Sequence, residues 1–202
     1  MVRKADAGLQ EERRRQILDA ALACFRRSGF RGASMAEICQ EAGMSAGHLY
    51  HYFPGKEAIV EALCARDLGL CLAVLTEAQS APAFAEVLVA RGAEEITAAI
   101  GANSPTFIEI IAESARNPRV AAILTGFQRE MEAMLAGGLR AAQAQGRLPL
   151  ALDADAAAAE ISLIVDGYFA RCAANPDYDA TGGRVHLRRL LARALRPDPA
   201  PG

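Results

Sequence analysis

The sequence predicts an all-α fold of about nine helices. Hydrophobic residues make up 52% of the 202-residue chain but aromatic residues only 5%, and alanine is abundant, a composition that favours helix over strand. Apolar residues recur at three- and four-residue spacing along most of the chain, the period of an amphipathic helix. Serine, asparagine, proline and glycine lie where such helices would begin or end, and no segment reads as a convincing strand.

The first helix is expected from about Gln10 to Ser28, after a loose tail over residues 1–9. Its apolar face is formed by Ile17, Ala20, Ala21, Cys24 and Phe25. Gly29 follows at the position where a helix C-cap prefers glycine, so the helix is expected to end there.

Two short helices joined by a tight turn come next. Ser34 opens the first with a capping box, in which its hydroxyl accepts from the Glu37 backbone and the Glu37 carboxylate reaches back. Gly43 ends this helix and can adopt a positive φ. Ser45 caps the second helix, which runs to about Tyr52. This order of capped helix, glycine turn and capped helix is typical of a helix-turn-helix.

The rest of the chain is expected to be helical too. Pro54-Gly55 separates the helix-turn-helix from a longer helix that starts near Lys56 and continues past Leu75. Gly137-Gly138 indicates a kink or a close helix crossing. Further helices are expected over residues 83–101, 106–115, 119–145, 153–173 and 184–196.

Charge is distributed unevenly along the chain. Residues 1–56 carry nine Lys/Arg and six Asp/Glu, whereas residues 57–202 carry thirteen and eighteen. A basic N-terminal segment and an acidic remainder favour nucleic acid binding at the N-terminal end.

The five cysteines form no C-x-x-C pair and are expected to be small buried residues in a reducing compartment.

Neither a membrane segment nor a catalytic site is expected. The chain shows no signal peptide and no run of about 18 apolar residues, so a cytoplasmic protein without membrane contact is expected. No metal or cofactor is expected, because His48 and His51 lie three residues apart with no third ligand nearby. Glu109 and Glu113 share a helical face, as surface charges or a polar anchor in a pocket rather than an enzymatic pair.

The run from Arg14 to Ala62 resembles the N-terminal domain of the TetR family of transcriptional regulators. The stretch AGMSAGHLYHYFPGKEAI matches the family pattern most specifically: a small residue and Gly, an apolar residue, Ser, two variable positions, Leu-Tyr-x-Tyr/His-Phe, then Lys. The remaining three quarters of the chain match only in helical character and length. Two positions depart from the pattern, since Ala46 replaces a residue that is often polar or basic and Pro54 lies between Phe and Gly.

The resemblance implies specific DNA contacts. Ser34 matches the hydroxyl residue that faces a phosphate, and Lys56 matches the lysine near the DNA backbone. The remaining implied DNA-binding residues belong to the recognition helix: Ser45, Ala46, Gly47, His48, Tyr50 and His51. Ser, Tyr and Lys side chains can donate to phosphate oxygens, which is the chemistry that these roles need.

The resemblance also implies two domains and a homodimer. Residues 1–56 would bind DNA, and residues 57–202 would bind an effector and dimerise. The dimer would form through the helices of about 153–173 and 184–196, so that two recognition helices meet a palindromic double-stranded operator. An unknown small molecule, largely apolar, would occupy a pocket whose candidate lining is Phe107, Ile111, Glu113, Phe127, Met131, Met134 and Phe169.

The expected function is thus a ligand-responsive transcriptional regulator, a repressor released from its operator by a small molecule. Three alternatives remain open: an activator, a ligand-binding module that no longer reads specific DNA, and a serine hydrolase. The hydrolase rests on Gly43-Met44-Ser45-Ala46-Gly47, which matches G-x-S-x-G. That nucleophile motif needs a strand before the serine, whereas the sequence predicts a helix there.

Overall fold

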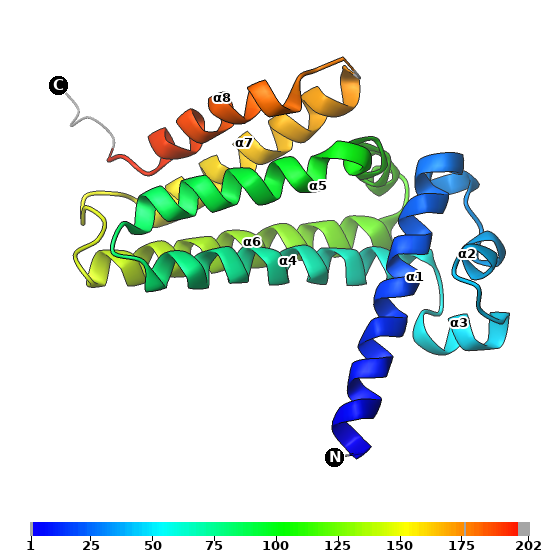
Figure 1. Cartoon of the computed structure of the whole chain (residues 1–202). Coiled ribbons are helices and arrows are strands. Elements are labelled where there is room, and N and C mark those ends of the chain that lie inside the picture. The colour runs from blue at the N-terminus through cyan, green and yellow to red at the C-terminus, as the bar shows by residue number, and fades with distance from the viewer. Residues whose placement is uncertain (1, 176, 198–202) are drawn as a thin grey trace. The chain divides into compact units, whose positions relative to one another are not determined.

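The computed structural model describes residues 2–175 and 177–197, and these residues contain helices and no strand (Figure 1). The helices are α1 (Val2–Gly32), α2 (Met35–Glu41), α3 (Ala46–Tyr52), α4 (Lys56–Ser80), α5 (Phe84–Ser114), α6 (Pro118–Ala144), α7 (Ala154–Ala174) and α8 (Ala180–Ala194). Because α1 is interrupted at Gly29, the eight elements comprise nine helical segments. The all-α prediction of about nine helices is confirmed. None of the described helices is long and apolar enough to cross a membrane.

The chain forms two compact units. Unit 1 comprises residues 1–65 and 105–124, and unit 2 comprises residues 66–104 and 125–202. Helices α4, α5 and α6 each contribute residues to both units. The functional boundary expected at residue 56 remains a prediction, since these units are defined by packing.

Unit 1 is built on the apolar face of α1. Ile17, Ala21 and Phe25 are almost completely buried there, as the three- and four-residue spacing predicts. Ile38 of α2 and Leu49 of α3 are fully buried in the same core cluster. The two short helices are therefore held by burial of one or two side chains each, which leaves most of their surface in solvent.

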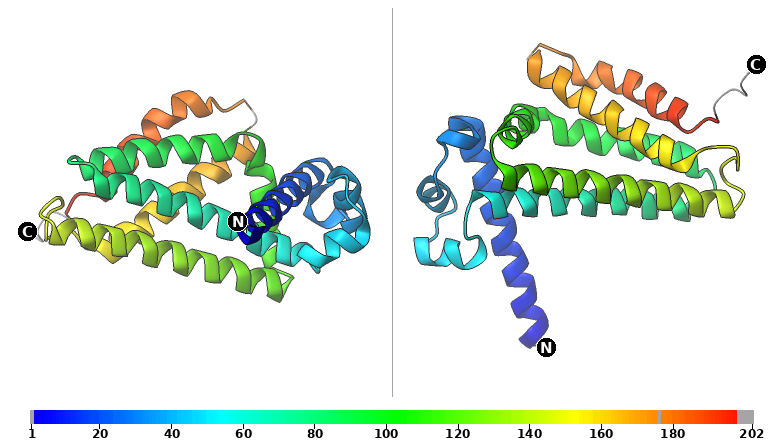
Figure 2. Two further views of the ribbon diagram at one scale, coloured as in Figure 1. Left: turned by 60° about the horizontal axis from the view of Figure 1, so that its bottom comes forward. Right: turned by 180° about the vertical axis from the view of Figure 1, so that it is seen from behind.

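Unit 2 is a helical bundle, and its helices appear in two further views in Figure 2. Within it, α5 runs antiparallel to α4 and α6, and α7 packs against α8. Arg147, which follows α6, closes the C-terminal end of α4: its guanidinium donates to the carbonyls of Gln79 at 2.7 Å and Ala81 at 3.1 Å. It also lies over the Phe84 ring, 5.5 Å from the centroid.

The glycine pair in α6 marks a close helix crossing rather than a kink. Helix α6 continues through both glycines. A Cβ atom added at Gly138 would lie 2.8 Å from Leu75 Cδ2 of α4, and Gln79 Nε2 donates to the Gly138 carbonyl at 2.8 Å. The same addition at Gly137 would meet nothing within 4 Å.

Three expected helix boundaries were wrong. Residues of the expected tail are helical from Val2, in a stretch that contains the good helix formers Lys4 and Ala5. The separate helices expected over 83–101 and 106–115 form one helix, α5, with Pro105 inside. The helix expected over 184–196 is α8, which begins at Ala180 and ends at Ala194.

Pro105 does not end α5 because packing holds the helix on both sides of it. A proline removes one backbone hydrogen bond from a helix interior and clashes with the preceding turn. Phe84, Leu88 and Ala93 are buried in the core of unit 2, and Ile110 is buried in that of unit 1. This burial offsets the local cost.

Candidate nucleic-acid interface

The helix-turn-helix expected at Ser34–Tyr52 is present, with both caps formed. The Ser34 backbone donates to Glu37 Oε2 at 2.7 Å, and the Glu37 backbone donates to the Ser34 hydroxyl at 3.2 Å, which completes the capping box. The Ser45 hydroxyl accepts from the His48 backbone at 3.4 Å. Ser45 follows a helix and a turn, so its G-x-S-x-G motif lacks the preceding strand of a nucleophile elbow.

The turn between α2 and α3 depends on a glycine with positive φ. Gly43 has a φ of 61°, in the left-handed region that glycine adopts without steric cost. The Gly43 and Met44 amides donate to the carbonyls of Gln40 and Cys39, both at 3.1 Å, which satisfies the last carbonyls of α2. Gln16 of α1 fastens the same turn, since its Nε2 donates to the Ala42 carbonyl at 2.8 Å.

Helix α3 places its predicted DNA contacts on one continuous exposed surface. Of its seven residues, Leu49 is buried and Tyr52 is half-buried against the core, and the other five are exposed. Tyr50 is 52% exposed, an unusual position for a large aromatic side chain. The exposed residues at and after the N-terminus of α3, called here the recognition surface, are Ser45, Ala46, Gly47, His48, Tyr50 and His51.

Aromatic contacts fix the two histidines of the recognition surface. The His48 and Tyr52 rings are 5.3 Å apart, and the His51 and Tyr52 rings are 5.5 Å apart in an edge-to-face arrangement. Such pairs stabilise ring orientation beyond simple burial. Tyr52 therefore supports both imidazoles while their exposed edges remain available to a partner.

Ser34 and Lys56, the other two predicted DNA contacts, have partners inside the chain. The Ser34 hydroxyl donates to Glu37 Oε2 at 3.0 Å. The Lys56 ammonium donates to the carbonyls of Phe30 at 2.6 Å and Ala33 at 2.7 Å, and to that of Arg31 at 3.3 Å. Three donors thus meet three acceptors, so a phosphate contact from either residue requires it to exchange one of these partners.

The arginines of α1 also make contacts within the chain. Arg14 lies over the Phe53 ring, 4.8 Å from its centroid, and Arg13 Nη1 donates to Gln16 Oε1 at 2.8 Å. The role of Gln16 in fastening the turn was missed by sequence reasoning. A contact between residues 26 positions apart leaves no local signal.

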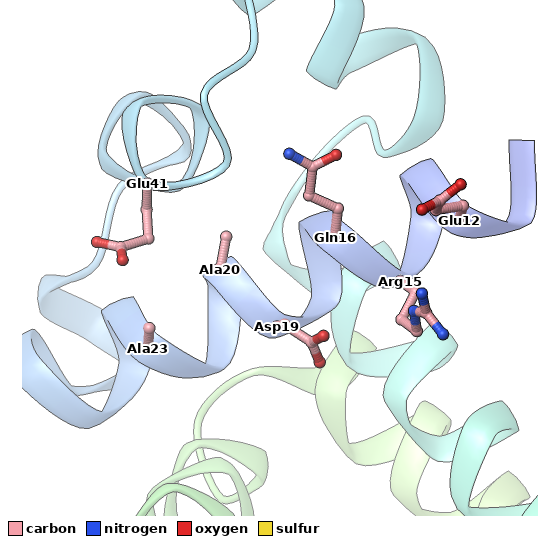
Figure 3. A pocket seen from close by; sticks show the side chains of 7 residues that line it. All are labelled: Glu12, Arg15, Gln16, Asp19, Ala20, Ala23 and Glu41. Atoms are coloured by element: carbon pink, nitrogen blue, oxygen red, sulfur yellow. The ribbon is translucent and has the colours of Figure 1, made fainter. Parts of the chain in front are cut away.

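A groove of about 620 Å³ lies along α1 in unit 1, and none of the predicted DNA-binding residues lines it (Figure 3). Its lining is Glu12, Arg15, Gln16, Asp19, Ala20, Ala23 and Glu41. Three carboxylates and a single guanidinium make this lining unfavourable for phosphate groups. We therefore assign no DNA contact to it.

The predicted effector-pocket residues divide between the two units. Phe107, Ile111 and Glu113 belong to unit 1, where Ile111 is 39% exposed. Glu113 is buried and accepts from Arg116 Nε at 2.9 Å, so it forms an ion pair within its own helix end. The other four are half-buried in unit 2: Phe127, Met131, Met134 and Phe169. Met131, Met134 and Phe169 pack against its core cluster.

Glu109 was expected to be a surface charge or a pocket anchor, and it is exposed and borders a cavity of about 210 Å³. Its carboxylate also binds the backbone, which the sequence did not predict. Its Oε2 accepts from the Phe30 amide at 2.7 Å, across 79 residues of sequence. The cysteines are free thiols, but only Cys24 and Cys39 are buried as expected. Cys64, Cys71 and Cys172 are half-buried. Burial raises the pKa of Cys71 to about 11 and also raises that of Cys24, so both thiols stay protonated and weakly nucleophilic at neutral pH.

Comparisons with known families agree with this geometry. Residues 17–63 match the model described as bacterial regulatory proteins, tetR family, which spans the helix-turn-helix. Residues 97–196 match the model described as BetI-type transcriptional repressor, C-terminal.

Individual proteins extend the similarity over most of the chain. The HTH-type transcriptional regulator UidR of Escherichia coli K12 is 35% identical over 135 residues, which cover 67% of this chain and 68% of UidR. The structure of Salmonella enterica GusR is 32% identical, with a TM-score of 0.71 over 91% of this chain and 95% of GusR. A Bacillus subtilis transcriptional regulator FadR, in complex with stearoyl-CoA, shares the fold at 21% identity and a TM-score of 0.65, covering 90% of this chain and 98% of FadR.

Proposed function

Because this chain belongs to the TetR family of bacterial transcriptional regulators, we propose that it represses transcription as a homodimer on a palindromic operator and leaves the DNA when a small molecule binds. The observation that carries the proposal is the exposed recognition surface on α3. Repression rather than activation is supported by the family model that matches residues 97–196, which is described as BetI-type transcriptional repressor, C-terminal.

The recognition surface suits the DNA major groove. A short helix with one buried side chain can enter the groove while its exposed side chains reach the base edges and flanking phosphates. The Ser45 and Tyr50 hydroxyls and the His48 and His51 imidazoles can donate to phosphate or base acceptors. Ala46 and Gly47 add no polar group, so they allow close approach of the helix backbone.

Helices α7 and α8 offer the surface for a second copy. They pack together in unit 2 and carry exposed apolar side chains, with Leu163 68% exposed, Val185 59% and Leu190 44%. The exposed face of α7 otherwise includes small residues such as Gly167 and Ala170, which permit close helix packing. Apolar surface of this kind on a soluble helix pair favours association with another copy.

The effector is proposed to be small and largely apolar. The candidate lining contributed by unit 2 consists of Phe and Met side chains, which adapt to apolar ligands. The FadR complex with stearoyl-CoA supports the ability of this fold to hold a ligand with a long apolar part. Release follows if the ligand binds the DNA-incompetent form more tightly than the DNA-bound form.

Operator binding is tested by fluorescence anisotropy of the full chain on the DNA upstream of its own gene, with random DNA as competitor and varied salt. We expect palindrome-dependent binding about 1,000-fold tighter than binding to random DNA. Tyr50→Ala should lose at least about tenfold of this affinity, and Tyr50→Phe, which keeps the ring, should lose less. Binding no tighter than to random DNA would contradict operator recognition and favour the ligand-binding module.

A further inference from the structure

The junction between α1 and α2, residues 29–34, has an unusual backbone. Gly29 adopts φ 70° and ψ 163°, which interrupts α1 and turns the chain toward Ser34. The Phe30 amide that follows is therefore directed away from the helix ladder. It donates to Glu109 Oε2 of α5 at 2.7 Å. A Cβ atom at Gly29 would lie 2.8 Å from the same oxygen, so the glycine also leaves room for the carboxylate.

A second charged side chain, that of Lys56, binds the backbone carbonyl of Phe30. Lys56, the first residue of α4, donates to the Phe30 carbonyl at 2.6 Å and lies 4.9 Å from the centroid of the Phe30 ring. The Phe30 ring itself is 3% exposed and packs 5.2 Å from Phe25. Both backbone groups of Phe30 are thus fixed by charged side chains from α4 and α5.

Two arginines beside the junction pair with Glu113. Arg116 Nε and Arg31 Nε lie 2.9 and 3.7 Å from Glu113 Oε2. A cavity of about 210 Å³ lies beside the junction and is lined by Ser28–Gly32, Glu109, Ala112, Glu113 and Arg116. The Glu109 carboxylate thus borders open space as well as the Phe30 amide.

We infer that Glu109 is a positioning residue for DNA recognition: its bond to the Phe30 amide holds the α1–α2 junction, and thereby α2 and α3, in the DNA-binding arrangement. The inference rests on the proposed function for its DNA-binding part. Helix α5 is continuous from residue 84 to 114, and its N-terminal part is buried in the core of unit 2. The Glu109 bond thus joins α5 directly to the α1–α2 junction, beside the burial of Ile110 in the core of unit 1.

Electrostatics and the positioning role predict opposite results for Glu109→Ala. Removing a negative charge from a DNA-binding unit should tighten DNA binding if charge alone matters. Loss of the junction bond should instead weaken specific binding, by about threefold to tenfold. Glu109→Gln keeps an acceptor oxygen and should bind nearly as the wild type. Glu61→Gln on α4, an exposed carboxylate of the same unit, is the matched control for charge.

Two measurements decide the inference. Anisotropy on the upstream DNA compares the four proteins, and hydrogen exchange without DNA follows the Phe30 amide and α2. We expect Glu109→Ala to weaken specific binding and to speed exchange at both places, while Glu109→Gln and Glu61→Gln do neither. Unchanged exchange in Glu109→Ala would overturn the inference, as would equal or tighter specific binding. Weakening in Glu109→Gln equal to that in Glu109→Ala would overturn the hydrogen-bond role.

The two proposals fail in distinguishable ways. If the wild type does not prefer its upstream DNA, operator recognition fails, and the exchange measurement still decides whether Glu109 holds the junction. If the wild type binds specifically and Glu109→Ala binds equally well, only the positioning role fails.

Discussion

At the scale of single residues, long basic side chains complete helix ends that the local sequence leaves open. The last carbonyls of a helix have no partner within it. Lys56 satisfies carbonyls at the end of α1, and Arg147 does the same for α4. Each cation also favours the negative end of the helix dipole and stacks on a buried phenylalanine.

The capping box of α2 should make the stability of unit 1 depend on pH. Hydrogen bonds from the Ser34 backbone, and then from its hydroxyl, hold the pKa of Glu37 below its ordinary value of 4.5. A lowered folded pKa means that the carboxylate stabilises the fold above pH 4.5 and that this contribution is lost as the pH falls through the folded pKa. We expect Glu37→Gln to lower the urea midpoint at neutral pH and this difference to shrink in acid. A difference that stays constant with pH would contradict this role.

At the scale of helices, local signals predicted some features and long-range contacts set the others. Ser34, Gly43 and Ser45 act on neighbouring backbone groups, so the helix-turn-helix was readable from the sequence. The continuity of α5 through Pro105 was not, because it depends on burial at both ends. The hydrogen bond between Glu109 and the Phe30 amide joins residues 79 positions apart, so no local sequence pattern predicts it.

The two adjacent glycines of α6 give a matched test of helix packing. Gly137→Ala should stabilise the protein by about 1 kcal/mol, because alanine is the better helix former and its Cβ meets nothing. Gly138→Ala gains the same propensity but forces its Cβ against buried Leu75, so it should be about 1–3 kcal/mol less stable than Gly137→Ala. Thermal or urea unfolding measures both variants. Equal stability of the two would contradict the close crossing with α4.

At the scale of the whole molecule, the proposed function requires two copies. One chain presents a single short recognition helix, whereas specific binding to a palindrome uses two, about 34–36 Å apart. The exposed apolar side chains of α7 and α8 provide the proposed contact between the copies. The sequence pattern of these helices alone did not separate such a contact from an ordinary core.

The dimer surface is tested by charge placed on α7. Leu163→Arg introduces an unpaired charge into the proposed contact and should weaken dimerisation by about tenfold or more. Sedimentation velocity over a concentration series measures the dissociation. Leu150→Arg is the control, because Leu150 is 83% exposed in the connection between α6 and α7. If both variants dimerise as the wild type does, the contact lies elsewhere.

Operator recognition by the α3 surface is tested most directly by hydroxyl-radical footprinting of the full chain on its upstream DNA, with Tyr50→Ala alongside. The account predicts two protected half-sites related by a palindrome, with centres one helical turn or a small multiple of it apart, about 10 base pairs per turn. Tyr50→Ala should lose this protection at the same protein concentration. A footprint without half-sites, or one that Tyr50→Ala leaves unchanged, would contradict operator recognition by α3.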